Sequence, residues 1–377
     1  MKTVVMFSSL LLPPSQTFIK AQAEELQQFI PYYVGCRRVQ GLTLPEDRTR
    51  VINQGNLLGV AQEVLFKVSG FAPKLYQEVK QLNPVLIHAQ FGLSGALALP
   101  WARSLKIPLL VHYRGADATI REEHARYSSL NHWTYFRQLE ALKQEARLFL
   151  TVSKFIGDKL LEQGFPPEKV RPHYHGVDVT QFCPDPAVSR QPAVLFVGRL
   201  TEKKGVQYLI EAMAQVQAIL PETELVMIGD GDLRPELEAL AAKKLRRYQF
   251  LGVQPQTVVK EWMNRVSILA APSVTASQGD SEGLPNVVLE AQAMGLAVVS
   301  TLHAGIPEAV IHEETGFLAP ERDVEKLADY CLRLLKDPEL RNRFSATGRE
   351  HVENNFNRHR QTRVLENIYQ DILQNQL

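Results

Sequence analysis

AVLFVGRLTEKKGVQYLIEAMAQVQAILPETELVMI, residues 193–228, is the stretch that decides the fold of this chain. It begins with an apolar run at 193–197, continues as a helical pattern at 206–220 and ends in a second apolar run at 224–228. Short apolar runs indicate buried strands, and a helix between two of them indicates a crossover in a parallel sheet. The stretch therefore predicts an α/β fold.

The same alternation extends in both directions from this stretch. Downstream we expect strands at 249–251, 267–271 and 297–300, helices at 234–244, 258–264 and 285–294, and helical structure from 323 to 377. Upstream we expect strands at 4–7, 32–34, 85–88, 109–113 and 148–152, with helices at 18–30, 93–105 and 133–146. The apolar run at 4–12 also resembles a signal peptide, but the prolines that end it favour a first strand.

Two domains follow from the length of 377 residues and from a proline-rich break, CPDPAVSRQP, at 183–192. We predict two facing, doubly wound Rossmann-like domains, at 1–185 and 192–356. An apolar stripe predicts that a helix at 357–377 returns to the first domain; its members are Val352, Phe356, Val364, Ile368, Tyr369 and Ile372. Ligands bind beyond the carboxyl ends of the strands in such sheets, so facing sheets would share one cleft.

Composition narrows the class of protein. The chain is 45% hydrophobic and 22% charged, as in soluble globular proteins, and its net charge of +1 gives no reason to expect nucleic acid. Residues 1–185 carry +5 and the remainder −4, which favours an acidic acceptor or anionic lipid, although chance also gives such differences. Cys36, Cys183 and Cys331 are far apart, which predicts reduced thiols in the cytoplasm and no zinc site. No apolar run approaches the ~20 residues that span a bilayer.

Two segments carry the chemistry. In the first, EGLPNVVLE at 282–290, Pro285 can start a helix whose N-terminus suits a diphosphate, with Glu282 and Glu290 on the same side. In the second, VGRLTEKKG at 197–205, Arg199 and Lys204 follow a strand end and would neutralise a departing diphosphate. Each segment alone also fits the surface of an ordinary helix or loop.

Together these segments resemble a large retaining glycosyltransferase family, family 4 of group 1 type with the two-domain GT-B fold. It includes bacterial lipopolysaccharide, capsule and exopolysaccharide transferases and sucrose-phosphate synthases. The resemblance covers most of the chain and is densest in the second half. Its further motifs are Ala293-Met294-Gly295, Gly305-Ile306-Pro307-Glu308, Gly316-Phe317, Gly229-Asp230-Gly231 and Phe250-Leu251-Gly252.

The resemblance implies a hexosyltransferase that uses a nucleoside diphosphate sugar, UDP- or GDP-linked, without cofactor or bound metal. It implies that Arg199 and Lys204 hold the diphosphate, Glu290 the ribose and Glu282 the sugar. The remaining donor contacts it implies are the turns at Gly231 and at Gly252 and Val253, and the helix start formed by Gly283, Leu284, Pro285 and Asn286. The pair Asp230 and Asp232 also suggests a metal site, which the family does not use.

One departure from the family lies in the first domain. Where the family often has Phe-His-Gly-x-Asp, this chain has His112-Tyr113-Arg114-Gly115-Ala116-Asp117. His112 and Arg114 are two apart on a strand and would share a face. An arginine cannot act as a base at neutral pH, so Arg114 is expected to bind an anion, either Asp117 or a group of the ligand. His112 equally fits a structural hydrogen bond.

We therefore expect a cytoplasmic enzyme of polysaccharide or glycolipid assembly, with a carbohydrate or lipid-linked acceptor and peripheral association with the inner face of the membrane. Two alternatives stay open: a sugar-nucleotide epimerase of the same fold, and a non-catalytic sugar-nucleotide-binding partner that lost activity through Arg114.

Overall fold

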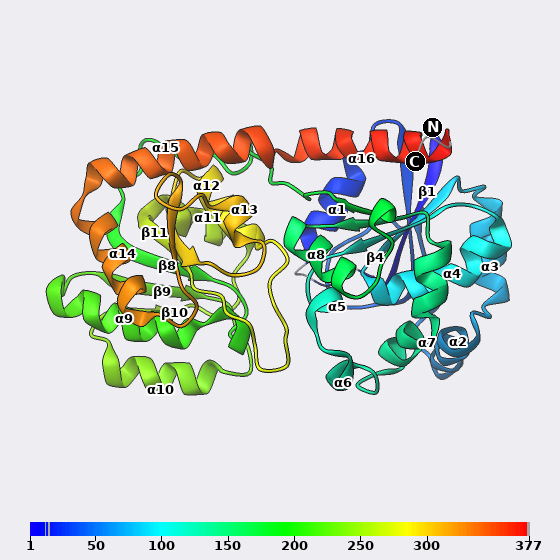
Figure 1. The fold of residues 1–377 in the computed structure, drawn as a ribbon, viewed down its shortest axis with the longest axis horizontal. Helices are drawn as coiled ribbons and strands as arrows, with labels where there is room; N and C mark the ends of the chain where they lie inside the picture. Colours follow the sequence, from blue (N-terminus) through cyan, green and yellow to red (C-terminus); the bar gives the residue numbers. More distant parts are fainter. Residues whose placement is uncertain (12, 14–15, 375–377) are drawn as a thin grey trace. The chain divides into compact units, whose positions relative to one another are not determined.

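The computed structural model describes residues 1–11, 13 and 16–374. The chain forms two compact units, one made of Met1–His175 with Arg358–Leu377 and the other of Gly176–Asn357. Each unit is a parallel sheet with helices on both faces (Figure 1). The predicted α/β fold with two Rossmann-like domains is confirmed.

The first unit contains a seven-stranded sheet. Its strands are β1 (Lys2–Leu11), β2 (Phe29–Arg38), β3 (Thr49–Asn53), β4 (Leu86–Gln90), β5 (Leu109–Tyr113), β6 (Leu148–Thr151) and β7 (Val170–Pro172). They are all parallel, in the order β3-β2-β1-β4-β5-β6-β7. The expected first strand is present as the buried β1 at the middle of this sheet.

The helices of this unit cover both faces of the sheet. They are α1 (Thr17–Glu24), α2 (Leu57–Ser69), α3 (Pro73–Gln81), α4 (Gly92–Leu105), α5 (Ala116–Thr119), α6 (Glu122–Ala125), α7 (Leu130–Glu145), α8 (Lys154–Glu162) and α16 (Arg358–Leu373). Alternation along β1 serves both faces: Val4 and Met6 join the core under α1 and α16, whereas Phe7 contacts Phe66 of α2 and Trp101 of α4.

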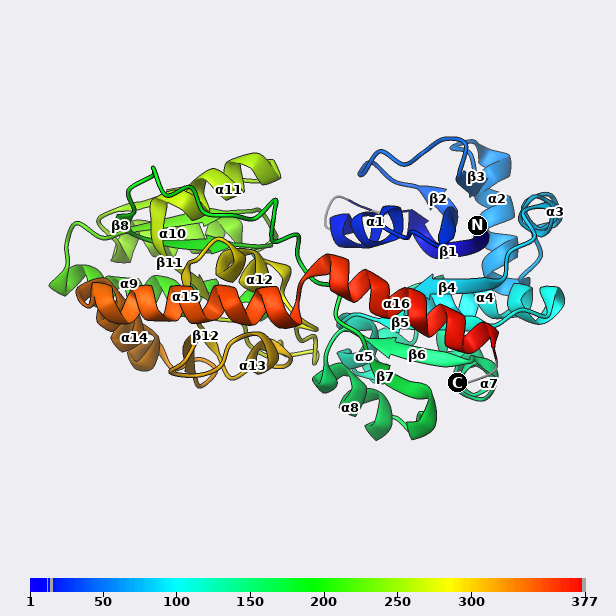
Figure 2. The ribbon, with the colours of Figure 1, turned by 90° about the horizontal axis from the view of Figure 1, so that it is seen from above.

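Helix α16 confirms the prediction that the last helix packs on the first domain. Leu365, Ile368, Tyr369 and Ile372 belong to the same core cluster as β1, β2 and β4 (Figure 2). Polar contacts fix the helix further, because the Glu366 carboxylate accepts the backbone N–H groups of Gln27 and Gln28 at 2.7 and 2.6 Å. Residues 358–373 are therefore an integral part of the first unit.

Helix α2 presents apolar side chains to the solvent. The outward side chains, together with Phe71 just beyond the helix, are between 38% and 90% exposed: Leu57, Leu58, Val60, Val64, Leu65, Val68 and Phe71. The inward face instead carries Glu63, which is 5% exposed, accepts from Asn53 at 2.9 Å and pairs with Lys67 at 2.6 Å. Phe66 also faces inward, 1% exposed and packed on Phe7 and Trp101, so α2 carries apolar side chains on both its buried and its exposed face.

The second unit contains a six-stranded parallel sheet in the order β10-β9-β8-β11-β12-β13. Its strands are β8 (Gln191–Val197), β9 (Glu224–Ile228), β10 (Tyr248–Phe250), β11 (Val266–Ala271), β12 (Ala297–Thr301) and β13 (Gly316–Ala319). Its helices are α9 (Val206–Ile219), α10 (Arg234–Lys244), α11 (Gln256–Arg265), α12 (Asn286–Ala293), α13 (Ile306–Ala309), α14 (Val324–Lys336) and α15 (Pro338–Asn355). A large core lies between this sheet and α9, α10 and α14.

The boundary between the units differs from the predicted one. The chain leaves the first unit after His175 and returns to it at Arg358, whereas the sequence placed the first domain's end at 185 and the linker at 183–192. That proline-rich segment is bound to the second unit: the Asp185 N–H donates to the Asn264 side chain at 2.9 Å, and Arg190 donates to the Met294 carbonyl at 2.7 Å. The prolines indicated an irregular segment, which was interpreted as a linker. The hydrogen bonds instead hold this segment on the second unit.

Candidate functional site

The loop after β8 carries the two predicted cations. Arg199 is exposed, and no hydrogen bond or ion pair of its side chain is found in the described part of the chain. The stem of Lys204 runs past Gly198, where an added Cβ would lie 3.5 Å from the Lys204 Cε. Gly205 then starts α9 with φ +62°, and a Cβ there would lie 2.0 Å from the Pro272 carbonyl oxygen. Glycines thus bring Lys204 close to the loop that follows β11.

Lys204 forms an ion pair with Glu282, the first carboxylate of the predicted motif. The Lys204 Nζ lies 2.8 Å from the Glu282 Oε1, and Glu282 is only 7% exposed. Burial alone would raise the pKa of Glu282, but the charges of Lys204 and Lys203 and the hydrogen bond from Lys204 outweigh it and lower this pKa to about 2. The structure therefore places an ionised carboxylate against a cation at the point where the two predicted segments meet.

Contacts that the sequence did not predict hold the loop of residues 272–285. Three consecutive residues after β8 each bind one residue of this loop. Glu202 accepts from the Ser277 backbone N–H at 2.9 Å, Lys203 donates to Asp280 at 2.9 Å, and Lys204 pairs with Glu282. No local sequence pattern indicates that residues 202, 203 and 204 contact residues 277, 280 and 282.

A histidine fixes the backbone of Glu282 from the other side. The Glu282 N–H donates to the Nε2 of His303 at 3.1 Å, and the Nδ1 of His303 lies 2.6 Å from the Oε1 of Glu321. Because Nε2 accepts, the proton of the neutral ring is on Nδ1 and is donated to Glu321. His303 is 1% exposed, and Glu321 also accepts from the Thr275 N–H at 2.9 Å. Sequence analysis missed His303 and Glu321, because no local sequence pattern indicates that Glu282, His303 and Glu321 come into contact.

Helix α12 carries Glu290, the second carboxylate of the predicted motif. Pro285 is its N-cap and Asn286 its first residue, and no side chain caps its N-terminus, so the first N–H groups face outward from the helix start. Burial raises the pKa of Glu290 to about 7, and a hydrogen bond with Gln256 opposes this shift. Gly283 and Leu284 are buried in the chain between the two carboxylates.

The predicted glycine turns lie beside the Arg199 loop. Gly229 has φ +136°, and a Cβ there would lie 1.9 Å from the Gly198 carbonyl oxygen. Its N–H donates to the Gly252 carbonyl at 2.8 Å, so the turn containing Gly231 and the turn containing Gly252 touch. Val253 is 76% exposed.

The metal alternative finds no support from geometry. The carboxylate of Asp230 accepts from Arg234 at 3.2 Å and from the Gly231 N–H at 2.8 Å. Within residues 1–11, 13 and 16–374, no three His, Cys, Asp or Glu side chains are grouped as metal ligands.

The first unit brings His112 and Arg114 together, as their spacing predicted. The Arg114 Nη2 lies 3.2 Å from the Nδ1 of His112 and donates to the Oε1 of Gln90 at 2.6 Å. Asp117 does not take up the guanidinium. Its carboxylate instead accepts the backbone N–H groups of Gly92, Arg114 and Gly115 at 2.9 to 3.0 Å.

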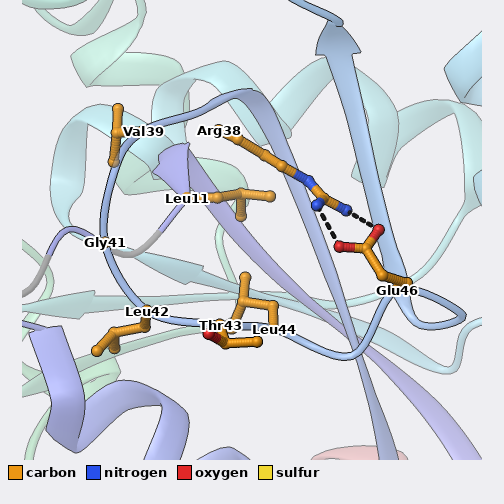
Figure 3. A pocket seen from close by; sticks show the side chains of 8 residues that line it. All are labelled: Leu11, Arg38, Val39, Gly41, Leu42, Thr43, Leu44 and Glu46. Atoms are coloured by element: carbon orange, nitrogen blue, oxygen red, sulfur yellow. Dashed lines mark hydrogen bonds and ion pairs between the residues drawn. The ribbon is translucent and has the colours of Figure 1, made fainter.

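A separate pocket of about 260 Å³ lies at the ends of β1 and β2 (Figure 3). Leu11, Leu42 and Leu44 supply much of its apolar lining, and Arg38 and Glu46 pair across its rim. Both members of that pair are exposed, and such pairs contribute little to stability or chemistry. The pocket therefore offers shape rather than reactive groups.

Among the described residues, no helix has the length and apolar character that crossing a bilayer requires.

Comparison with known proteins identifies the family. Residues 191–337 match the family described as Glycosyl transferases group 1, and residues 16–181 match Glycosyltransferase Family 4. The amylovoran biosynthesis glycosyltransferase AmsK of Erwinia amylovora is 36% identical over 294 residues, which cover 75% of this chain and 69% of AmsK. WcaL of Escherichia coli K12, whose name assigns it to colanic acid biosynthesis, is 33% identical over 298 residues, with the same two coverages.

The fold is shared with a solved structure. Anabaena HepE, crystallised with UDP and glucose, superposes with a TM-score of 0.79 at 19% identity, over 98% of this chain and all of that one. The two parallel sheets of this chain agree with the shared fold. The chain belongs to glycosyltransferase family 4 of group 1 type, enzymes of the GT-B fold that transfer a sugar from a nucleotide-sugar donor.

Proposed function

We propose that this enzyme transfers a sugar, with retention of anomeric configuration, from a UDP- or GDP-linked donor to a carbohydrate or glycolipid acceptor in polysaccharide or glycolipid assembly. The observation that carries the proposal is the Lys204–Glu282 ion pair at 2.8 Å. It joins, in one place, the cation needed for a leaving diphosphate and the carboxylate needed for a sugar hydroxyl.

In the proposed reaction, the bond between the sugar C1 and the diphosphate oxygen breaks, and its electron pair stays on the diphosphate. Arg199 and Lys204 stabilise that charge. The acceptor oxygen bonds to C1 from the same face, and its proton passes to the departing phosphate oxygen. Glu282 binds the sugar, and its backbone is held in place by His303.

Further donor contacts belong to the same proposal. Glu290 accepts the ribose hydroxyls, and the uncapped start of α12 from Gly283 through Asn286 faces the phosphates. The turns at Gly231, Gly252 and Val253 border the base. Two side-chain cations serve the diphosphate in this scheme, so we expect activity to persist in EDTA. Complete loss that magnesium restores would contradict that expectation.

The domain roles are proposals as well. We assign the acceptor to the first unit and the nucleotide sugar to the second, because the second carries the Arg199, Lys204, Glu282 and Glu290 set. We place the enzyme in the cytoplasm, since Cys36, Cys183 and Cys331 are all free thiols. We also propose peripheral membrane association through the apolar face of α2, which is large for an unpartnered surface.

A panel of UDP-, GDP- and ADP-sugars tests the donor by thermal stabilisation. Ligand at ~100 times its dissociation constant adds ~2.7 kcal/mol to the free energy of unfolding. The stabilising donor is then assayed for hydrolysis and for sugar transfer to membrane glycolipid extracts. Binding without hydrolysis or transfer would favour a non-catalytic binding partner, and change of the sugar at C2 would favour an epimerase.

A further inference from the structure

The guanidinium of Arg114 is held by uncharged groups. Its Nε and Nη2 donate to the Gln90 Oε1 at 3.2 and 2.6 Å, its Nη2 lies 3.2 Å from the His112 Nδ1, and its plane covers the Phe18 ring at 4.9 Å. Burial lowers the pKa of Arg114 to about 9, which still leaves it charged at pH 7. Among the described residues no carboxylate contacts this fixed positive charge directly, although the charge of Asp117 acts on it.

The neighbouring groups do not neutralise this charge. Asp117, the carboxylate next to it in sequence, is already committed to three backbone N–H groups. Burial first, and then the charge of Arg114, hold the pKa values of His88 and His112 well below the usual range, so both rings are neutral at pH 7. Within the described residues, Arg114 forms no ion pair with any carboxylate. A buried cation of this kind is costly unless something pairs with it.

Three hydrogen-bond donors at Arg114 and its two direct neighbours are unused. The Nη1 of Arg114, the Nε2 of Gln90 and the Nε2 of His112 are buried and have no partner among the described residues. Since the Nδ1 of His112 accepts from Arg114, its Nε2 carries the ring proton. Gln90 and His112 are direct neighbours across β4 and β5 and are 1% and 0% exposed. One cation with two neutral donors suits an oxyanion.

The position agrees with a ligand site. Gln90 is the last residue of β4 and Arg114 directly follows β5. Ligands of open parallel sheets bind beyond these carboxyl ends. The donor diphosphate already has its own cations, Arg199 and Lys204, in the other unit.

We propose that Arg114, with Gln90 and His112, binds an oxyanion of the acceptor, either a phosphate or a carboxylate. This inference rests on the proposed function, because it assigns the acceptor to the first unit. It makes the acceptor acidic, and it gives arginine at this position a binding role in place of the family's histidine.

The test uses inorganic phosphate and acetate as probes, titrated by calorimetry into the full chain. Arg199→Gln with Lys204→Gln and Glu282→Gln forms the background, so that the donor site does not contribute and no buried carboxylate is left without its cation. In this background we expect binding of phosphate, acetate or both to persist. Adding Arg114→Gln should weaken it at least tenfold, whereas Arg114→Lys should keep most of it. Preference for phosphate indicates a phosphorylated or lipid-phosphate acceptor, and preference for acetate an acidic sugar.

Gln90→Glu gives a second, nearly isosteric variant. It keeps the oxygen that Arg114 binds but adds a carboxylate that neutralises the guanidinium, so it too should abolish anion binding. Thermal stabilisation by UDP or GDP is also measured on Arg114→Gln and Gln90→Glu without the background substitutions. Stabilisation shows that these variants are folded, and it tests the donor proposal independently of the acceptor proposal. The inference is overturned if neither anion binds the background protein, or if Arg114→Gln and Gln90→Glu bind as tightly as it does.

Discussion

Arg199 and Lys204 carry the same charge on one loop, but their surroundings differ. Arg199 is exposed and has no side-chain partner among the residues that the structure describes, whereas Lys204 neutralises the buried Glu282. Arg199→Ala and Lys204→Ala should each lower turnover by roughly 10²–10³, since each removes a charge from the leaving diphosphate. Only Lys204→Ala should also lower the free energy of unfolding, by about 3 kcal/mol, because it leaves a buried carboxylate unpaired.

Turnover and chemical denaturation measured on the same preparations separate the two effects. Lys243→Ala, at an exposed position of α10, is the matched control and should change neither. Full turnover in both loop variants would remove the diphosphate assignment.

If Glu290 binds the ribose as proposed, nucleotide binding should depend on pH. Its pKa is about 7 in the folded protein against 4.5 for an ordinary glutamate, so its ionisation opposes folding as pH rises from 4.5 to 7. Glu290→Gln should therefore become more stable relative to the wild type across this range, and the difference should level off above pH 7. Nucleotide affinity should rise with pH in the wild type, because the carboxylate accepts the ribose hydroxyls, and should be weak and flat in Glu290→Gln. Parallel melting and nucleotide titrations from pH 4.5 to 8 check both; a stability difference that falls with pH would contradict the assignment.

At this scale the sequence predicted residue types better than contacts. Lys204 and Glu282 were each expected at the donor, and His112 was expected beside Arg114. That Lys204 pairs with Glu282 could not be foreseen, because the contact depends on how two loops approach through Gly205 and Pro272. The support from His303 and Glu321 arises in the same way, from strand ends that only the folded sheet brings together.

At the scale of elements, α2 makes the most specific prediction. Its outward leucines and valines should insert into a bilayer interface, and cations around it, among them Lys74 and Arg137, favour anionic lipid. We expect the protein to sediment with vesicles containing phosphatidylglycerol, and less with pure phosphatidylcholine. Leu58→Glu with Val64→Glu should reduce sedimentation at least fivefold.

Ile219→Glu is the control for this experiment, because it changes an exposed apolar residue on a helix of the other unit. Light scattering in the absence of lipid tests whether a second copy of the chain, instead of a membrane, binds α2. A dimer that Leu58→Glu with Val64→Glu dissociates would show that α2 binds a second copy instead of a membrane.

The distribution of apolar side chains in α2 also explains why sequence analysis missed it. A helix is recognised by an apolar stripe on one face, but α2 has apolar side chains on its exposed face and both Phe66 and the carboxylate of Glu63 on its buried face. Strands β3, β7 and β13 were missed because they are short edge strands, and β3 and β7 also carry polar residues. Most elements of the second unit were predicted within a few residues, since its buried parallel strands read as continuous apolar runs.

At the scale of the whole molecule, the first unit is discontinuous in sequence and the second is continuous. Residues 176–357 expressed alone should therefore fold cooperatively and keep nucleotide binding. Residues 1–175 alone lack Leu365, Ile368, Tyr369 and Ile372, and should expose the core that these side chains cover. Adding a peptide of residues 358–377 should restore cooperative melting of that fragment. Cooperative melting of 1–175 without the peptide would show that α16 is dispensable for this unit.

Tyr369 makes this discontinuity matter during biosynthesis. Its hydroxyl lies 2.6 Å from the Nδ1 of His88, a residue of β4, the strand that ends in Gln90. A ribosome makes residues 1–175 first, yet the polar cluster of β4 and β5 cannot be completed until the entire second unit has been translated. The nascent first unit must therefore persist with an open apolar face throughout that interval, during which chaperones can bind it. The order of synthesis thus makes the second unit the first to finish folding, although most of the first unit is encoded before it.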